Sequence, residues 1–147
     1  MTGWRVGFVC GPKEIIAGMT KIHQYTIMCV SITSQMAACE ALHVGKKYVE
    51  EMKREYRRRR EFVIDGLNEI GLTCHKPQGA FYAFPSVKKT GLSSLEFAQK
   101  LLKEEKVAVV PGTAFGDNLE DYIRISYASS FDNLKEALRR MKKFVNK

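Results

Sequence analysis

The feature that most constrains the fold is a long amphipathic segment over residues 46–70. Apolar side chains recur there at steps of three and four residues, with Arg59 in the one gap: Val49, Met52, Tyr56, Val63, Leu67 and Ile70. This spacing places them on one side of an α-helix, so the segment predicts a long helix with a buried stripe. Such a helix must pack its stripe against another layer, and Gly71 is well placed to end it.

The same segment carries much of the positive charge, in a run from Lys53 to Arg60 within a net charge of +8. On the predicted helix most of these arginines fall on the outer face, three or four positions from acidic residues with which they can pair. A basic run can also bind nucleic acid, but no aromatic stacking platform accompanies this one. The pattern favours a solvated helix face and predicts no nucleic-acid partner. A basic binding module is the alternative interpretation.

After this helix, short apolar runs alternate with turn residues and helix caps. Strands are predicted at residues 72–75, 80–84, 107–110 and 122–127, and helices from 93 to 103 and after Ser129 or Ser130. The second of these helices has Ser capping, and the first has capping-box spacing in Ser93 and Glu96. Residues 45–147 therefore predict a small α+β domain with a short sheet covered by helices.

Residues 1–44 cannot close on themselves in the same way. A strand is predicted from Trp4 to Cys10, a helix over 13–27 after Pro12, and a second helix over 31–44. One strand with two apolar helices can neither pair its edges nor bury its faces. We therefore expect a boundary near Gly45 and self-association of the uncovered segment, most simply as a homodimer. The alternative is that this segment packs on the rest of the chain as an extra layer.

Composition narrows the class of protein. The 147 residues are 45% hydrophobic and 27% charged, which is typical of a globular chain rather than a disordered one. The longest apolar stretch, residues 22–38, is interrupted by polar side chains and predicts no membrane span. No secretory signal pattern is recognised, so we expect a cytoplasmic protein. Four cysteines lack metal-ligand spacing, so no metal is expected and each thiol is predicted to be reduced and buried: Cys10, Cys29, Cys39 and Cys74.

Four short motifs follow one another along the chain: GWR at 3–5, GAFY at 79–82, PGTAFG at 111–116 and RISY at 124–127. Together they resemble the C-terminal part of the class I, fold type I, pyridoxal-phosphate aminotransferases of the aspartate and aromatic type, from Thr2 to about Phe144. The resemblance implies an α/β intact enzyme that moves an amino group between an amino acid and a 2-oxo acid. Residues 1–44 would then be a remnant of the large cofactor-binding domain with interdomain and dimer-interface helices, and residues 45–147 the small C-terminal domain.

The resemblance also implies roles for two arginines. Arg5 would bind the phosphate of the cofactor and Arg124 the α-carboxylate of the substrate, since a guanidinium can donate two parallel hydrogen bonds to such groups. Strand alternation places Arg124 on the face opposite Ile123 and Ile125, where a half-buried charge needs an anion. The alternatives are an exposed arginine at a strand start for Arg5 and, for Arg124, an edge-strand arginine paired with Asp121 or Glu120.

Two further expectations come from the resemblance. Phe81 is the better candidate for an aromatic ring in the substrate pocket, although an aromatic residue in a strand is as often part of the core. The lysine that forms the Schiff base in the family would precede Met1, so we expect no catalytic residue, no bound cofactor and no activity in this chain alone. Another fold type I enzyme, such as a carbon–sulfur lyase or a synthase, is an alternative, as is a short product with an interaction role.

Overall fold

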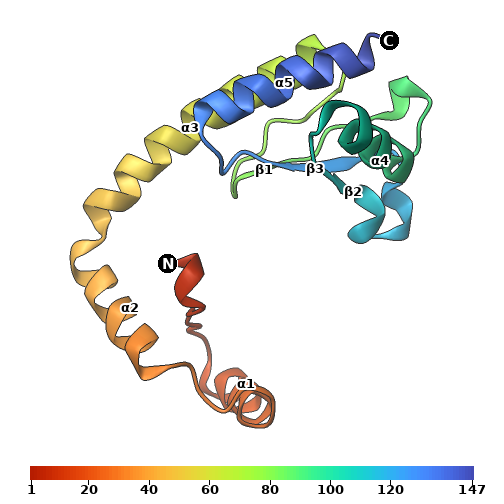
Figure 1. The fold of residues 1–147 in the computed structure, drawn as a ribbon. Coiled ribbons are helices and arrows are strands. Elements are labelled where there is room, and N and C mark those ends of the chain that lie inside the picture. The colour runs from red at the N-terminus through yellow and green to blue at the C-terminus, as the bar shows by residue number, and fades with distance from the viewer. The chain divides into compact units, whose positions relative to one another are not determined.

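The structure is a computed structural model that describes residues 1–147, and the chain separates into two compact units (Figure 1). Unit 1 is residues 1–51 and unit 2 is residues 52–147, so the division between the two units falls inside a helix. The helices are α1 (Lys13–Thr26), α2 (Ile32–Val44), α3 (Lys46–Glu69), α4 (Ser94–Glu105) and α5 (Phe131–Val145). The strands are β1 (Tyr82–Ala83), β2 (Val110–Pro111) and β3 (Ile123–Ser126), and the 3-10 helices are Thr2–Trp4, Lys88–Thr90, Gly112–Ala114 and Asp117–Leu119.

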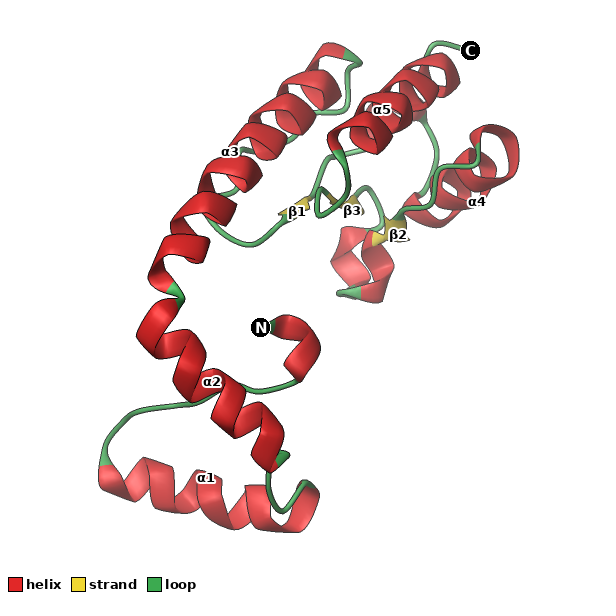
Figure 2. Ribbon diagram, turned by 60° about the vertical axis from the view of Figure 1, so that its left-hand side comes forward, coloured by secondary structure: helices red, strands yellow, loops and turns green.

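The strands of unit 2 form one antiparallel sheet in the order β1-β3-β2 (Figure 2). Tyr82 is opposite Ser126 in one pair, and Val110 is opposite Arg124 in the other. An isolated antiparallel bridge between Ser86 and Tyr122 continues the register of β1 with β3. Because β3 lies in the middle, its side chains have neighbours on both sides. The α+β class predicted for this part of the chain is confirmed.

Helices α3, α4 and α5 pack with the sheet around a single core. Its buried apolar residues come from the three helices, the sheet and the segments that connect them: Val63, Ile64, Leu67, Ile70, Leu72, Cys74, Ala83, Val87, Phe97, Leu101, Ile123, Tyr127, Leu134 and Met141. The predicted caps are confirmed at both later helices. Ser93 and Glu96 form a reciprocal capping box at α4, and the Ser130 hydroxyl accepts a hydrogen bond from the Asn133 amide at α5. These local bonds satisfy amide groups that a helix start leaves unpaired.

Two of the five predicted strands do not form, and the other three were predicted to begin too early. Residues 4–10 form no strand, because unit 1 offers no second segment to pair with their backbone groups. Residues 72–75 are also outside the sheet, although the Thr73 carbonyl accepts a hydrogen bond from the Ser86 amide at 2.9 Å. Of the segment 107–110, only Val110 belongs to a strand. Apolar sequence identified these segments, but the available partners decided whether they paired.

Burial also departs from the sequence prediction. The predicted stripe is buried at Val63 and Leu67 of α3 and at Ile70 directly after it, but Val49 and Met52 are 53% and 55% exposed. Of the four cysteines only Cys74 is buried, and burial raises the pKa of its thiol. The other three are exposed, so their predicted burial is wrong: Cys10, Cys29 and Cys39. In each case the error lies where nothing in the chain covers the apolar side chain.

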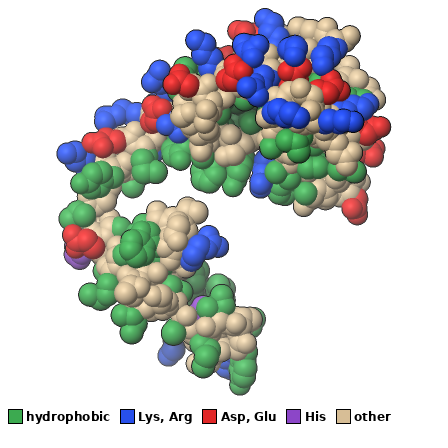
Figure 3. Space-filling model, viewed as in Figure 1, with side chains coloured by type: hydrophobic (Ala, Val, Ile, Leu, Met, Phe, Trp, Pro, Cys, Tyr) green, Lys and Arg blue, Asp and Glu red, His purple; other side chains and the backbone are tan.

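The charged residues of α3 are arranged as the periodicity predicted. Glu55 accepts a hydrogen bond from the Arg59 guanidinium at 2.8 Å, one turn away, and lies 3.8 Å from Arg58. Lysine and arginine side chains gather on the surface of unit 2 over α3 and α5, interspersed with acidic ones (Figure 3). No helix combines the length and the apolar character that crossing a membrane requires.

Candidate functional site

Arg124 lies on the central strand of the sheet, half-buried, between two aromatic rings. Its Cζ atom is over the ring of Tyr82, 4.4 Å from the centroid, and over the ring of Phe115 at 4.5 Å. Such contacts attract a cation to the negative face of an aromatic ring. Alternation along β3 puts Arg124 on the same face as Tyr122 and Ser126, as the sequence predicted, because successive residues of a strand point to opposite faces.

The alternative interpretation of Arg124 as an edge-strand arginine with an acidic partner is wrong. Strand β3 is flanked on both sides, and the neighbouring carboxylate of Asp121 lies 3.6 Å from the ammonium group of Lys88. Neither Glu120 nor any other residue forms a hydrogen bond or ion pair with the Arg124 guanidinium. A half-buried guanidinium therefore keeps its in-plane N–H donors free for an anion from outside unit 2.

The face around Arg124 carries further aromatic rings. Phe84 stacks on Tyr122, with centroids 5.7 Å apart and planes at 14°, and meets Phe115 edge-on at 6.0 Å. Tyr82 and Phe115 belong to the GAFY and PGTAFG motifs, but the sequence pattern connected neither ring with Arg124. The signal was present for Tyr82, since an antiparallel register that opposes it to Ser126 makes Arg124 its diagonal neighbour. No local pattern could have found Phe115, which reaches Arg124 from a turn.

Phe81 precedes β1 and faces the core more than the open face. Its ring stacks on Tyr56 at 6.0 Å and contacts Tyr82 at 4.6 Å between centroids. It is partly buried and packs against the core cluster. Phe81 is thus one ring removed from Arg124, and its place in a substrate pocket stays a prediction.

The turn ahead of β1 is held in a strained conformation. Ala80 has a φ of 58°, in the left-handed region that costs a residue with a side chain about 1–2 kcal/mol. The buried Tyr127 hydroxyl donates to the Ala80 carbonyl at 2.9 Å, and Arg60 donates to the Pro77 carbonyl at 2.9 Å. Burial raises the pKa of Tyr127, against a smaller lowering by Arg60, so its hydroxyl keeps the proton that it donates. These bonds fix where Phe81 and Tyr82 enter the sheet.

A second turn, after β2, places Phe115. The Gly112 amide donates to the Tyr122 carbonyl at 2.8 Å, and the Phe115 amide donates back to Gly112 at 2.8 Å. A Cβ atom at Gly112 would collide with the carbonyl oxygens of Leu119 and Tyr122. Only glycine fits this close approach of backbone to backbone.

Arg5 belongs to unit 1 and ends the first 3-10 helix in a left-handed conformation, with φ at 52°. Its side chain is exposed, and the guanidinium donates a single long hydrogen bond, from Nη1 to the Thr2 carbonyl at 3.4 Å. A hollow of about 360 Å³ adjoins it, lined by Thr2, Arg5, Val6 and Gly7. Most of its donors are therefore free, although the strand that was expected to begin here does not form.

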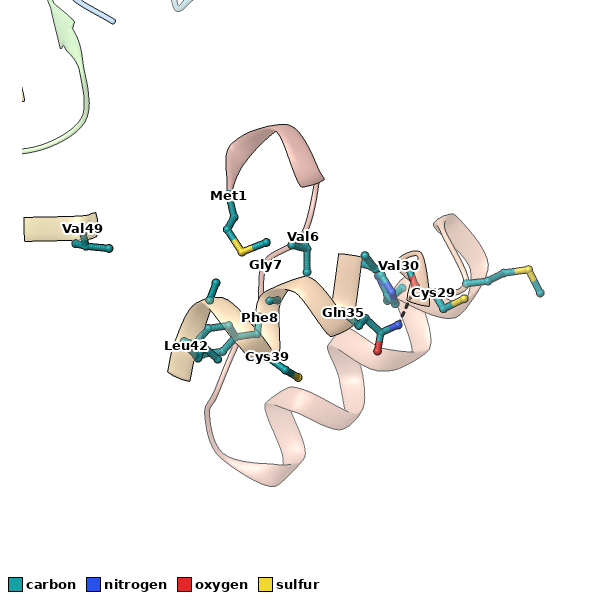
Figure 4. A pocket seen from close by; sticks show the side chains of 14 residues that line it. Met1, Val6, Gly7, Phe8, Cys29, Val30, Gln35, Cys39, Leu42 and Val49 are labelled. Atoms are coloured by element: carbon teal, nitrogen blue, oxygen red, sulfur yellow. Dashed lines mark hydrogen bonds between the residues drawn. The ribbon is translucent and has the colours of Figure 1, made fainter. Parts of the chain in front are cut away.

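A larger hollow of about 870 Å³ also lies in unit 1, between the N-terminal segment and α2 (Figure 4). Its lining is almost wholly apolar, with Met1, Val6, Phe8, Cys39 and Leu42 exposing their side chains to it. The Gln35 amide is engaged with the Val30 carbonyl at 2.8 Å. No arginine or lysine lines this hollow, and its polar side chains are those of His23 and Gln35.

Comparison with known proteins gives one family for almost the entire chain. Residues 1–141 match the family described as "Aminotransferase class I and II". The chain is similar to an aspartate aminotransferase of Pyrococcus abyssi, with 52% identity over 99% of this chain and 38% of that protein. It is also similar to aromatic-amino-acid aminotransferase 2 of Thermococcus litoralis, with 49% identity over 99% of this chain and 38% of the relative.

Solved structures agree with this. The crystal structure of an aromatic aminotransferase from Pyrococcus horikoshii superposes with a TM-score of 0.91 and 49% identity, over 99% of this chain and 40% of that one. The chain thus spans about 38% of the length of the curated relatives that it matches.

Proposed function

Because the chain belongs to the class I and II aminotransferase family, we propose that residues 1–147 are part of a pyridoxal-phosphate enzyme that moves an amino group between an amino acid and a 2-oxo acid. In this proposal they are the C-terminal region of that enzyme, which acts as a homodimer in the cytoplasm. Unit 2 contributes the group that holds the substrate, and unit 1 contributes a group that holds the cofactor.

The observation that carries the proposal is the lack of any protein anion beside Arg124. Its guanidinium is half-buried between Tyr82 and Phe115, and no acidic side chain pairs with it. Leaving such a charge unpaired is unfavourable unless an anion reaches it when the protein works. A carboxylate matches the two parallel N–H donors of a guanidinium. Relatives named for aspartate and for aromatic amino acids match with similar identity, and amino acids of both kinds have the α-carboxylate that we assign to Arg124.

Arg5 has the donor set that a phosphate group needs. Its guanidinium is exposed, donates one long hydrogen bond to the Thr2 carbonyl and borders a hollow that is also lined by Gly7. A non-glycine residue at positive φ is a feature that concentrates at functional sites. We therefore assign the cofactor phosphate to Arg5. When bound, pyridoxal phosphate supplies the electron-withdrawing ring on which transamination depends, and the protein supplies orientation and charge.

In this scheme the two arginines act by holding groups in place. Arg124 fixes the substrate through its carboxylate, which limits the orientations in which the Cα–H bond can be presented. Arg5 anchors the cofactor at its phosphate. The lysine that would carry the cofactor is, by the family resemblance, expected ahead of Met1.

The test is a comparison of two substitutions in the full-length enzyme. Arg124→Ala should lower kcat/KM for aspartate or an aromatic amino acid by a factor corresponding to about 2–5 kcal/mol, because a desolvated charge pair loses one partner. Arg5→Ala should mainly weaken retention of pyridoxal phosphate, measured by the absorbance of the cofactor after dialysis. Arg124→Lys is the matched control for charge without the planar fork. If Arg124→Ala released the cofactor and left amino-acid kinetics unchanged, the two assignments would be wrong.

A further inference from the structure

We propose that Tyr82 and Phe115 are positioning residues that hold the Arg124 guanidinium between their rings, ready to receive a carboxylate. This inference rests on the proposed function, because it concerns the residue assigned there to the substrate. It adds two residues to the site for which no role has been assigned by the resemblance.

Both rings contact the guanidinium directly. The ring centroids of Tyr82 and Phe115 lie 4.4 and 4.5 Å from the Arg124 Cζ atom, yet the two rings make no contact with each other. They therefore approach the guanidinium from different sides. The two rings come from separate elements, since Tyr82 is in β1 and Phe115 follows the 3-10 helix Gly112–Ala114.

Each of the two rings is itself supported by another ring. The Tyr82 ring contacts Phe81 at 4.6 Å, and Phe81 packs on Tyr56 of α3. The Phe115 ring meets Phe84 edge-on at 6.0 Å. Aromatic side chains have only two χ angles, so rings packed in this way are rigid compared with an arginine side chain. The supports connect Arg124 to the core on one side and to the sheet face on the other.

Aromatic rings can hold a cation in place where no anion pairs with it. An acidic partner would fix Arg124 as well, but it would occupy the same N–H donors that a substrate carboxylate requires. A ring face attracts the cation through its quadrupole and uses none of those donors. An arginine side chain has about 2 kcal/mol of rotamer entropy to lose on binding. Rings that confine the side chain beforehand reduce that loss, which favours binding of the carboxylate.

The experiment measures carboxylate affinity in full-length holoenzyme. The probes are 3-phenylpropionate and succinate, two carboxylates without an amino group, titrated against the cofactor absorbance. Tyr82→Leu and Phe115→Leu should each raise the Kd of the tighter probe by about 2- to 30-fold, the range that corresponds to one cation–π contact. KM for the amino acid should rise in parallel, with a smaller change in kcat. Tyr82→Phe and Phe115→Tyr keep a ring and should stay within about twofold of wild type.

A matched control is Tyr122→Leu. Tyr122 is on the same face and stacks on Phe84, but its ring does not contact Arg124. Its substitution should leave the Kd within about twofold. Phe115 is 46% exposed, so Phe115→Leu is expected to fold and carries the test if Tyr82→Leu does not. A thermal unfolding scan of each variant distinguishes a protein that fails to fold from a folded protein in which Arg124 is no longer held in place.

The outcomes distinguish the two proposals. If Arg124→Ala weakens probe binding and the two leucine variants, properly folded, do not, the positioning role is wrong while the proposed function stands. An equal loss in Tyr122→Leu would also overturn it, because the effect would then belong to the whole aromatic face. If Arg124→Ala itself leaves the probe Kd unchanged, the proposed carboxylate site is wrong.

Discussion

Unit 1 and unit 2 are both rich in apolar residues, but only unit 2 buries them. Within unit 2, α3, α4, α5 and the sheet enclose a core in which Leu67, Phe97 and Ile123 are fully buried. Within unit 1, the one buried residue is Ser34, whose hydroxyl donates to the Trp4 carbonyl at 2.9 Å. Large apolar side chains of α1 and α2 stay exposed, among them Ile22, Tyr25 and Leu42.

The difference shows that apolar content and secondary structure do not suffice for a core. A helix needs a second layer over its apolar stripe, and α5 supplies one for the end of α3. Exposed apolar surface of the extent seen in unit 1 marks a place where another surface packs. In the proposed function that surface belongs to the remainder of the intact enzyme and to its second subunit.

The largest effect on the free energy of unfolding is expected from a matched pair of leucine substitutions, one in each unit. Leu67 is 0% exposed in unit 2 and Leu42 is 70% exposed in unit 1. Leu67→Ala should lower the free energy of unfolding by about 2–5 kcal/mol, because a cavity is left in the core. Leu42→Ala should change it by no more than about 0.5 kcal/mol. Urea unfolding of residues 1–147, followed by circular dichroism at 222 nm, measures both.

Similar losses for the two leucines would contradict the comparison, since they would mean that unit 1 has a core of its own. Trp4, the one tryptophan of the chain, reports on unit 1 separately through its fluorescence. Its emission should already resemble that of an exposed indole before urea is added, because 53% of Trp4 is accessible.

A smaller effect is expected from a pair of glycines. Gly112→Ala would force a Cβ atom against the carbonyl oxygens of Leu119 and Tyr122, which backbone hydrogen bonds hold in place. We expect a loss of about 1–3 kcal/mol in the free energy of unfolding, as for other overpacked sites. Gly18→Ala in α1 meets nothing within 4 Å and should be neutral or stabilising by about 0.5–1 kcal/mol, since alanine favours a helix. Equal destabilisation by the two would show that α1 is packed.

The smallest effect concerns pH and is expected in unit 2. Arg139 and Arg140 donate hydrogen bonds to the Glu136 carboxylate on α5 and lower its pKa from 4.5 to about 2. A lowered pKa in the folded state gives stability that is complete above about pH 4.5 and is lost as the pH falls towards 2. Glu136→Gln removes this contribution. The difference in unfolding midpoint between wild type and variant should therefore shrink between pH 5 and pH 2, and a constant difference would contradict the assignment.

Much of the local structure could be predicted from the sequence. Helices α1, α2, α3, α4 and α5 were all expected, because helical hydrogen bonds, caps and i,i+4 ion pairs join residues a few positions apart. Arg124 was identified through the family resemblance, and strand alternation placed it on the face that it occupies. Arg5 was identified through its motif, although its strand did not form.

Tertiary structure alone decided which apolar side chains are covered and what surrounds the key charge. Val49 and Leu67 belong to one predicted stripe, yet one is exposed and the other buried, because only distant segments can cover a helix face. The same holds for Arg124. Its charge and its face follow from the residues beside it, but the ring of Phe115 reaches it from another element. Burial and long-range contacts depend on which segments meet in space, and the hydrogen bonds of a single helix do not determine that.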